Sequence, residues 1–150
     1  RLVAKKSNLD RGEGVFLITK LTQLNEYLGK SYLIQEYIPE KADLRLIVLG
    51  GKTIGCIRRI PTKNEFRVNI SRGGKGETYL ADDEAKKLAE RAAAAMKYDF
   101  AGVDIAVGPD DKKYILEVNR SQQYQEFIRA TGINVTKLLA DFLEGKLIPK

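Results

Sequence analysis

Two carboxylates and an amide stand close together near the middle of the chain, in segments that otherwise look like buried strands. Asp104 lies in AGVDIAV, whereas Glu117 and Asn119 lie in YILEVN, beyond the turn-like GPDD. A hairpin that turns between Asp110 and Asp111 places Asp104 directly opposite Glu117. Because side chains alternate along a strand, Asn119 then lies on the same face. The spacing therefore predicts three oxygen-bearing side chains on one face of a hairpin.

Such an arrangement is expected to bind a cation. Like charges directly across a strand pair repel, so the pairing weakens the sheet unless a cation lies between them. Oxygen ligands suit Mg²⁺, which completes its shell with phosphate oxygens and water when few protein groups hold it. Gly102 and Ala106 leave room above the acids, and the opposite face is predicted to be core: Val103, Ile105, Val107, Leu116 and Val118. An incidental acid pair on a solvated face is the alternative interpretation, and a slipped register would also separate the three side chains.

A glycine-rich turn near the amino terminus is a candidate anion site. Gly12 and Gly14 follow Lys5 in AKKSNLDRGEG. Glycines let the backbone approach a ligand closely and turn its N–H groups toward an anion. No G-K-[ST] sequence follows, so the Walker pattern is excluded and any phosphate would lie under a hairpin. An ordinary flexible turn is the alternative.

Arginines in two other stretches could also contact anions. Arg67 and Asn69 lie in the glycine-rich FRVNISRGGKG, where cations could clamp phosphate or carboxylate groups, although a mobile basic loop is the alternative. Arg45 lies inside the apolar LRLIVL. A buried arginine needs an anionic partner, for which the sequence offers Asp43, Glu36 or a ligand.

Composition limits the chemistry further. The 150 residues are 43% hydrophobic, which is enough for one domain with its own core. The chain contains no histidine, so imidazole bases and histidine zinc sites are excluded, and carboxylate or amide oxygens would hold Mg²⁺ or Mn²⁺. The net charge of +6 predicts affinity for anions without choosing among nucleotides, acidic peptides and nucleic acid. The single cysteine, Cys56, is expected to be a buried thiol in a reducing, cytoplasmic setting, and no apolar run is long enough to span a membrane.

The elements that must position these side chains follow from periodicity and turn signals. Strands are expected at 2–5, 14–19, in 31–38, at 44–49 and 53–60 around a turn at Gly50, and at 100–107 and 112–119. An amphipathic segment runs from Leu21 to Gly29, and 61–76 has no regular pattern. One helix begins at Asp82 or Asp83 and buries Ala85, Leu88, Ala89, Ala92, Ala93 and Met96. A last helix runs from Asn134 to Gly145 and buries Val135, Leu138, Leu139 and Phe142.

Taken together, these stretches resemble the ATP-grasp superfamily, in particular the ligases that add glutamate to ribosomal protein S6 and the related lysine-biosynthesis ligases. The resemblance covers nearly the whole chain, in order: LVAK, DRGEGVFL, QEYI, DLRLIVLGGK, FRVNISRGGKG, AGVDI, LEVN and TGIN. It implies an α+β fold, the carboxy-terminal portion of an ATP-grasp fold, with antiparallel sheets and packed helices forming two lobes around a nucleotide cleft. Residues 1–150 would be one partial domain, in which 1–38 belong to the small nucleotide lobe with its flap and hinge, and 39–150 form the core lobe with the metal site.

The resemblance also implies roles for individual residues. Lys5 would contact nucleotide phosphate, Gly12 and Gly14 would belong to the flap, and adenine would meet the backbone of Gln35, Glu36, Tyr37 and Ile38. The implied magnesium ligands are Asp104, Glu117 and Asn119. Arg67 and Asn69 would lie near the transferred phosphoryl group and the acyl substrate, with Arg45 in the same cleft.

The implied activity is ATP-dependent ligation of a carboxylate to an amine through an acyl phosphate, with ATP and Mg²⁺ (or Mn²⁺). Glutamate or another amino acid would be added to a protein terminus or a small-molecule acceptor. We expect the chain, which begins at Arg1, to be the carboxy-terminal portion of a longer protein, inactive without its amino-terminal domain. Whether the protein forms a homo-oligomer stays open.

One loop departs from the family pattern. After EVN the relatives usually have a small residue and then Ser-Pro-Gly, whereas this chain has RSQQYQEF, which places Arg120, Gln122 and Gln123 beside the implied site. The acid and amine substrates are therefore open, and a degenerate module that binds nucleotide without ligation is the alternative. A nucleic-acid module is a third, less favoured hypothesis, because no base-stacking pattern is present.

Overall fold

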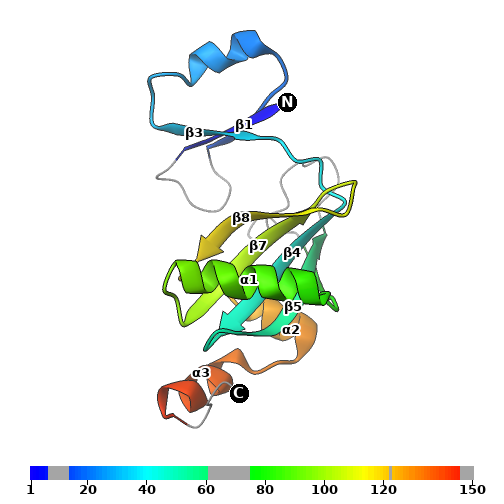
Figure 1. Cartoon of the computed structure of the whole chain (residues 1–150), viewed down its shortest axis with the longest axis vertical. Coiled ribbons are helices and arrows are strands. Elements are labelled where there is room, and N and C mark those ends of the chain that lie inside the picture. Colours follow the sequence, from blue (N-terminus) through cyan, green and yellow to red (C-terminus); the bar gives the residue numbers. More distant parts are fainter. Residues whose placement is uncertain (7–13, 61–74, 122, 146–150) are drawn as a thin grey trace. The chain divides into compact units, whose positions relative to one another are not determined.

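The computed structural model describes residues 1–6, 14–60, 75–121 and 123–145. It divides into two compact units, Arg1–Pro39 and Glu40–Lys150. The first unit contains a three-stranded sheet and the second a larger sheet with helices, and Figure 1 shows both units. No helix among the described residues is long and apolar enough to cross a membrane.

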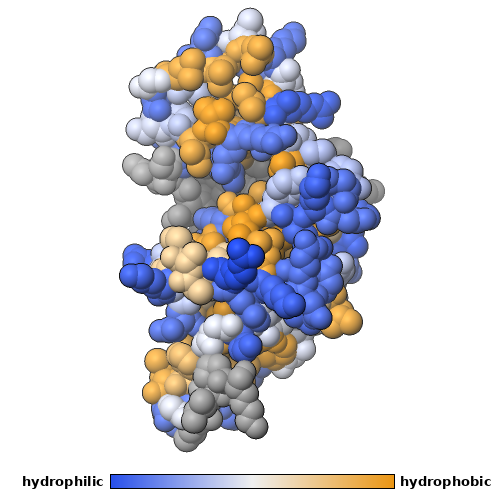
Figure 2. All heavy atoms as spheres, in the orientation of Figure 1, coloured by the Kyte–Doolittle hydropathy of each residue, from blue (hydrophilic) through white to orange (hydrophobic). Residues whose placement is uncertain are grey.

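The first unit is an antiparallel sheet of order β2-β1-β3. Its strands are β1 (Leu2–Lys6), β2 (Val15–Ile18) and β3 (Tyr32–Glu36). The amphipathic segment forms a 3-10 helix, η1 (Leu21–Glu26), with no buried residue. Tyr27, which follows η1, joins Phe16 and Tyr32 in an aromatic cluster with ring centroids 5.1–6.1 Å apart. Leu21 and Leu28 are 78% and 56% exposed, and Figure 2 shows apolar atoms on the surface of this unit.

The second unit is built on a five-stranded antiparallel sheet of order β6-β5-β4-β7-β8. The strands are β4 (Ala42–Leu49), β5 (Lys52–Ile60), β6 (Lys75–Thr78), β7 (Phe100–Val107) and β8 (Lys113–Asn119). The antiparallel sheets and packed helices agree with the expected architecture. Strand β6 was not expected, because its residues lie in and just after a stretch without regular apolar alternation.

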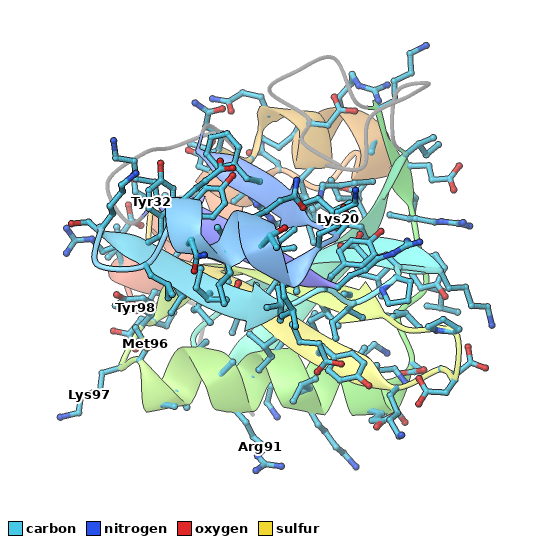
Figure 3. The ribbon with its side chains drawn as sticks, turned by 90° about the horizontal axis from the view of Figure 1, so that it is seen from above. Lys20, Tyr32, Arg91, Met96, Lys97 and Tyr98 are labelled. Atoms are coloured by element: carbon cyan, nitrogen blue, oxygen red, sulfur yellow. The ribbon has the colours of Figure 1, made fainter. Side chains whose placement is uncertain are left out.

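Helix α1 (Asp83–Ala95) covers one face of this sheet (Figure 1). Asp82 caps it, with its carboxylate accepting a hydrogen bond from the Ala85 N–H at 2.8 Å. Small alanines let the helix lie close to the core strands, and Ala85, Ala89 and Ala93 are all buried. Met96 was expected on this face but is 49% exposed, because the helix ends there. On the outward side, Figure 3 shows Arg91 and Lys97 pointing away from the ribbon, and Figure 2 shows mainly hydrophilic side chains.

The opposite face of the sheet is covered at one end by helix α2 (Gln125–Thr131). Phe127 is 1% exposed and packs with Ile47 and Ile57. A Cβ added at Gly55 would lie 2.7 Å from Phe127 Cζ, so the absence of a side chain there lets α2 approach the strands. The sequence analysis did not predict this helix.

Helix α3 (Val135–Leu143) begins as expected, since the Asn134 side chain accepts a hydrogen bond from the Lys137 N–H at 2.9 Å. Only Val135 is fully buried within it. The expected burial of its other apolar side chains is wrong, because they lie half-buried at its surface: Leu138, Leu139 and Phe142.

Candidate functional site

The hairpin of β7 and β8 has the predicted pairing at its functional end. Asp104 is the register partner of Glu117, and Gly102 is the partner of Asn119. Beyond Asp104 the register shifts at a bulge, so that Ile105 faces Ile115 rather than Leu116. The predicted register is therefore confirmed on the side that carries the acids and is wrong by one residue on the side of the turn.

Across the whole sheet, the acids belong to two neighbouring rows on the face that α1 does not cover. One row runs through the register partners Thr78, Ile57, Arg45, Asp104 and Glu117. The next row runs through Gly76, Arg59, Asp43, Ala106 and Tyr114. Two basic and three acidic side chains thereby come together from four strands. We call Asp43, Arg45, Arg59 and Asp104 the charged quartet.

Asp104 is only 4% exposed and is held by two arginines. Both of its oxygens accept hydrogen bonds from Arg45, from Nε to Oδ1 and from Nη2 to Oδ2 at 2.8 Å. Arg59 Nη1 donates to the same Oδ2 at 3.3 Å. The arginines thus supply the positive charge that the repulsion between Asp104 and Glu117 requires, so repulsion alone does not demand a metal ion.

The partner of Arg45 differs from the acids named for it. Asp104 accepts its hydrogen bonds, whereas Asp43 is bonded to Arg59. Glu36 belongs to the other unit. The general expectation that this arginine has an anionic partner is confirmed, and the choice between neighbouring acids was wrong because it depends on the strand register.

Arg59 is held mainly by Asp43, with Nε and Nη2 lying 2.9 and 2.5 Å from Oδ1. The two residues are 9% and 4% exposed. Burial raises the pKa of Asp43 to about 6, against the opposing effect of the Arg59 charge and its hydrogen bonds. Burial alone would lower the pKa of Arg59, but the neighbouring Asp104 and Asp43 carboxylates raise it above its usual value, so this guanidinium stays charged.

The two other candidate ligands are more accessible. Glu117 is exposed and Asn119 half-buried, and neither side chain has a hydrogen-bond or ion-pair partner among the described residues. A carboxylate offers about four lone-pair sites, and the arginines use three of those on Asp104, which leaves one on Oδ1.

The donor set fits a hard divalent ion. Within the described ranges no three Asp, Glu, His or Cys side chains gather closely enough to hold a metal, so the Asn119 amide would be the third ligand beside two carboxylates. Oxygen donors of this kind suit Mg²⁺ or Mn²⁺.

The candidate nucleotide residues lie in the first unit. Lys5 is opposite Val15 and Leu33 in the sheet, so it shares their face. Gly14 has φ 71° and its carbonyl accepts a hydrogen bond from the Lys6 N–H at 3.0 Å, which closes the turn. Gln35 and Glu36 belong to β3, followed by Tyr37, whose N–H donates to the Arg1 carbonyl at 3.2 Å, and by Ile38.

Three candidate residues, Gly12, Arg67 and Asn69, lie outside the described residues, as does Gln122 of the departing loop. Arg120 and Gln123 are described and exposed. Arg59 was missed, because IRRI was treated only as an apolar strand. Its signal was the same as that of Arg45: an arginine in an apolar strand that needs an anionic partner.

Similar proteins of known sequence are ligases. The chain is 31% identical over 150 residues to a "Probable alpha-L-glutamate ligase" of Haemophilus influenzae strain PittEE, covering 95% of this chain and 50% of that protein. It is 41% identical over 123 residues to the protein of that name from Aeromonas salmonicida, covering 79% and 40%. With "Glutamate--LysW ligase ArgX" of Sulfurisphaera tokodaii it shares 29% over 133 residues, covering 88% and 47%. The chain thus spans about half the length of the curated relatives it matches.

Solved structures show the same fold. The ATP-grasp ligase PsnB, solved with a minimal precursor, superposes with a TM-score of 0.77 at 20% identity, covering 97% of this chain and 49% of that one. D-alanine--D-alanine ligase from Bacillus anthracis gives a TM-score of 0.69 at 22% identity, covering 95% and 53%. The RimK-like ATP-grasp domain matches residues 1–143. Fold, relatives and domain match agree with the expected resemblance, and the chain belongs to the RimK-like ATP-grasp family.

Proposed function

We propose that this chain is the carboxy-terminal part of an ATP-dependent carboxylate–amine ligase. The observation that carries the proposal is the juxtaposition of Asp104, Glu117 and Asn119 on one sheet face, beside Arg45. Membership in a family whose relatives are named as glutamate ligases supports it. The activity belongs to the complete protein, since the chain spans about half of those relatives.

Asp104, Glu117 and Asn119 would hold Mg²⁺ (or Mn²⁺), which when bound neutralises charge on nucleotide phosphates. Arg45 supports Asp104 through two hydrogen bonds and fixes the direction of its carboxylate. Glu117 and Asn119 have no competing partner among the described residues, so turning toward a ligand costs them no contact within that part of the chain. Arg45, with a side chain 17% exposed, is also proposed to contact an anionic substrate group.

The proposed reaction has two steps. The γ-phosphoryl group of ATP passes to a substrate carboxylate oxygen, which gives an acyl phosphate and ADP. An amine then attacks the acyl carbon, so that a C–N bond forms, the C–O bond to phosphate breaks, and inorganic phosphate and a proton leave. Phosphoryl transfer depends mainly on positioning and charge stabilisation, so a chain without histidine can serve it. Arg67 and Asn69 are proposed to act near the transferred group.

Lys5, Gly12 and Gly14 are the proposed phosphate contacts of the nucleotide, and the backbone of Gln35, Glu36, Tyr37 and Ile38 is the proposed adenine contact. This assignment makes residues 1–38 part of a small nucleotide lobe and 39–150 a core lobe with the metal site.

For the substrates, we propose that glutamate or another amino acid is added to a protein terminus or a small-molecule acceptor. The names of the glutamate ligases and of the glutamate–LysW ligase support this choice.

The test is acid-dependent ADP formation by the complete protein with ATP, Mg²⁺ and candidate amino acids. Glu117→Gln removes the charge of one proposed metal ligand. We expect it to lower the rate of ADP formation at least tenfold, because even groups that only orient metal ligands change metal affinity or activity by that factor. Glu77→Gln removes an equally exposed carboxylate from β6 and serves as the matched control. Full activity of Glu117→Gln would contradict the metal assignment.

A degenerate module that binds nucleotide without ligation is the second candidate. It is favoured by the polar, exposed Arg120 and Gln123 directly after Asn119. Nucleotide binding with no acid-dependent ADP formation across a broad panel of amino acids and peptides would favour this candidate over the ligase.

A further inference from the structure

We propose that Asp43 and Arg59 are positioning residues for the cation site, in which Asp43 holds Arg59 and limits how strongly Arg59 competes with a cation for Asp104. This inference rests on the proposed function of Asp104 as a metal ligand. It concerns Arg59, to which the sequence pattern gave no role, and Asp43, which was considered only as a partner of Arg45.

Arg59 contacts Asp43 more closely than it contacts Asp104. Two of its nitrogens, Nε and Nη2, lie 2.9 and 2.5 Å from Asp43 Oδ1, whereas only Nη1 reaches Asp104 Oδ2, at the longer distance of 3.3 Å. Asp43 and Arg59 are also register partners on adjacent strands, so their backbones are fixed to each other. Asp43 therefore determines where the guanidinium points.

The charge balance of the quartet explains how Asp43 affects cation binding at Asp104. The charged quartet contains two carboxylates and two guanidinium groups, and hence no net charge when all four are ionised. If Asp43 is made neutral, the quartet carries one excess positive charge in a poorly hydrated place. Arg59 then has Asp104 as its remaining carboxylate partner in the quartet, and a stronger pair between them opposes the binding of a divalent cation to that carboxylate.

Asp43 and Arg59 consequently act together, and the effect of losing one depends on the presence of the other. Asp43→Asn leaves Arg59 paired with Asp104 alone within the quartet, and hence as a stronger competitor for that carboxylate. The double variant with Arg59→Met removes the competitor as well, and replacement of a buried ion pair by neutral groups is often tolerated by the fold. A purely structural role predicts the opposite order, in which the double variant is at least as damaged as the single one.

The experiment measures Mn²⁺ affinity of the complete protein by electron paramagnetic resonance, with saturating non-hydrolysable imido-ATP. Asp43→Asn is expected to weaken Mn²⁺ binding 10- to 100-fold, the usual range for groups that orient metal ligands. The Asp43→Asn/Arg59→Met variant is expected to return to within a factor of about three of the wild type.

Asp111→Asn is the matched control. It makes the same charge change in an exposed carboxylate paired with Lys41 at 2.6 Å, and asparagine tolerates the φ of 60° at this turn. Its Mn²⁺ affinity is expected to equal that of the wild type.

Two results would overturn the inference: Asp43→Asn binding Mn²⁺ as tightly as Asp111→Asn, or the double variant binding as weakly as Asp43→Asn. If Asp43→Asn alone does not fold, the double variant decides, since near-wild-type affinity supports the inference and a large loss overturns it. Failure of the proposed metal site gives a different result, because the wild type would then show no nucleotide-dependent Mn²⁺ binding, whereas failure of ligation alone appears as absent acid-dependent ADP formation. If Glu117→Gln weakens binding while Asp43→Asn does not, the function stands and only the inference fails.

Discussion

Removing the Arg59 guanidinium is expected to destabilise the second unit in a pH-dependent way. Arg59→Met leaves the Asp43 carboxylate, 4% exposed, without its counter-ion. Breaking a buried pair by removing one partner costs about 3–5 kcal/mol, which is the loss expected at pH 8, where Asp43 is ionised.

The sign of the pH dependence follows from Asp43. Its pKa is raised from 3.8 to about 6, so its contribution favours the fold fully below pH 3.8 and is lost as the pH rises through about 6. Arg59 lowers this pKa, so the variant should raise it further. At pH 5 the variant buries a protonated carboxyl group, whose missing partner costs only about 1–3 kcal/mol.

Cys56 provides a local assay. It is the single cysteine of the chain, is 4% exposed in β5, and has its pKa raised to about 12 by burial. The rate at which Cys56 reacts with 4,4′-dithiodipyridine in urea reports opening of this unit in the complete protein at both pH values. Mass spectrometry identifies Cys56 as the labelled residue. An equal loss at pH 5 and pH 8, or a loss that is larger at pH 5, would refute the reasoning.

Three further substitutions test other contacts. Gly55→Ala places a Cβ 2.7 Å from Phe127 Cζ and should cost about 1–3 kcal/mol of unfolding free energy, seen as faster amide exchange in α2. Glu126→Gln weakens the pair with Arg129. In the wild type, Arg129 and the backbone N–H of Gly76 lower the pKa of Glu126 to about 2. Because this pair is partly exposed to water, the expected loss of unfolding free energy is only about 1 kcal/mol at pH 7. In urea titrations that loss should fade as the pH drops from 4.5 through about 2, and a constant difference would contradict it. Asp82→Ala removes the α1 cap and should cost about 1 kcal/mol in the same titrations, whereas no change would show that the cap is dispensable.

The functional hairpin could be predicted because its turn is short and its alternation is regular. GPDD indicated the hairpin, but next to the turn Val107 faces Lys113, one residue away from the predicted pairing. The bulge beside Ile105 shifts the register back and brings Asp104 opposite Glu117 as predicted. A bulge adds one residue to a strand and has no reliable signal in a single sequence.

A second bulge, between β4 and β5, explains why the charged quartet was not predicted. Next to the Gly50 turn, Val48 faces Thr53, and continuing that register would place Arg58 opposite Asp43. A shift between Ile47 and Val48 brings Arg59 there instead, and leaves Arg58 exposed. Because one residue of slip exchanges the two faces of a strand, the sequence alone could not say which arginine is buried.

Helix α2 was not predicted for another reason. Its seven residues are too few for an apolar stripe to repeat, and it is held by tertiary contacts of Phe127 rather than by its own propensity. The converse holds for α3, where a regular stripe predicted the helix but not how little of it would be covered.

The contact between α2 and β6 bears on solubility as well as on fold. Among the described strands β6 lies at the edge of the sheet, and such an edge can recruit a strand from another molecule. At Gly76 the Glu126 carboxylate accepts from the N–H at 2.6 Å and Arg129 donates to the carbonyl at 3.0 Å. The Thr78 hydroxyl donates to the Ala130 carbonyl. Side chains of one short helix thus occupy both backbone groups of Gly76, which removes them from pairing with a strand of another molecule.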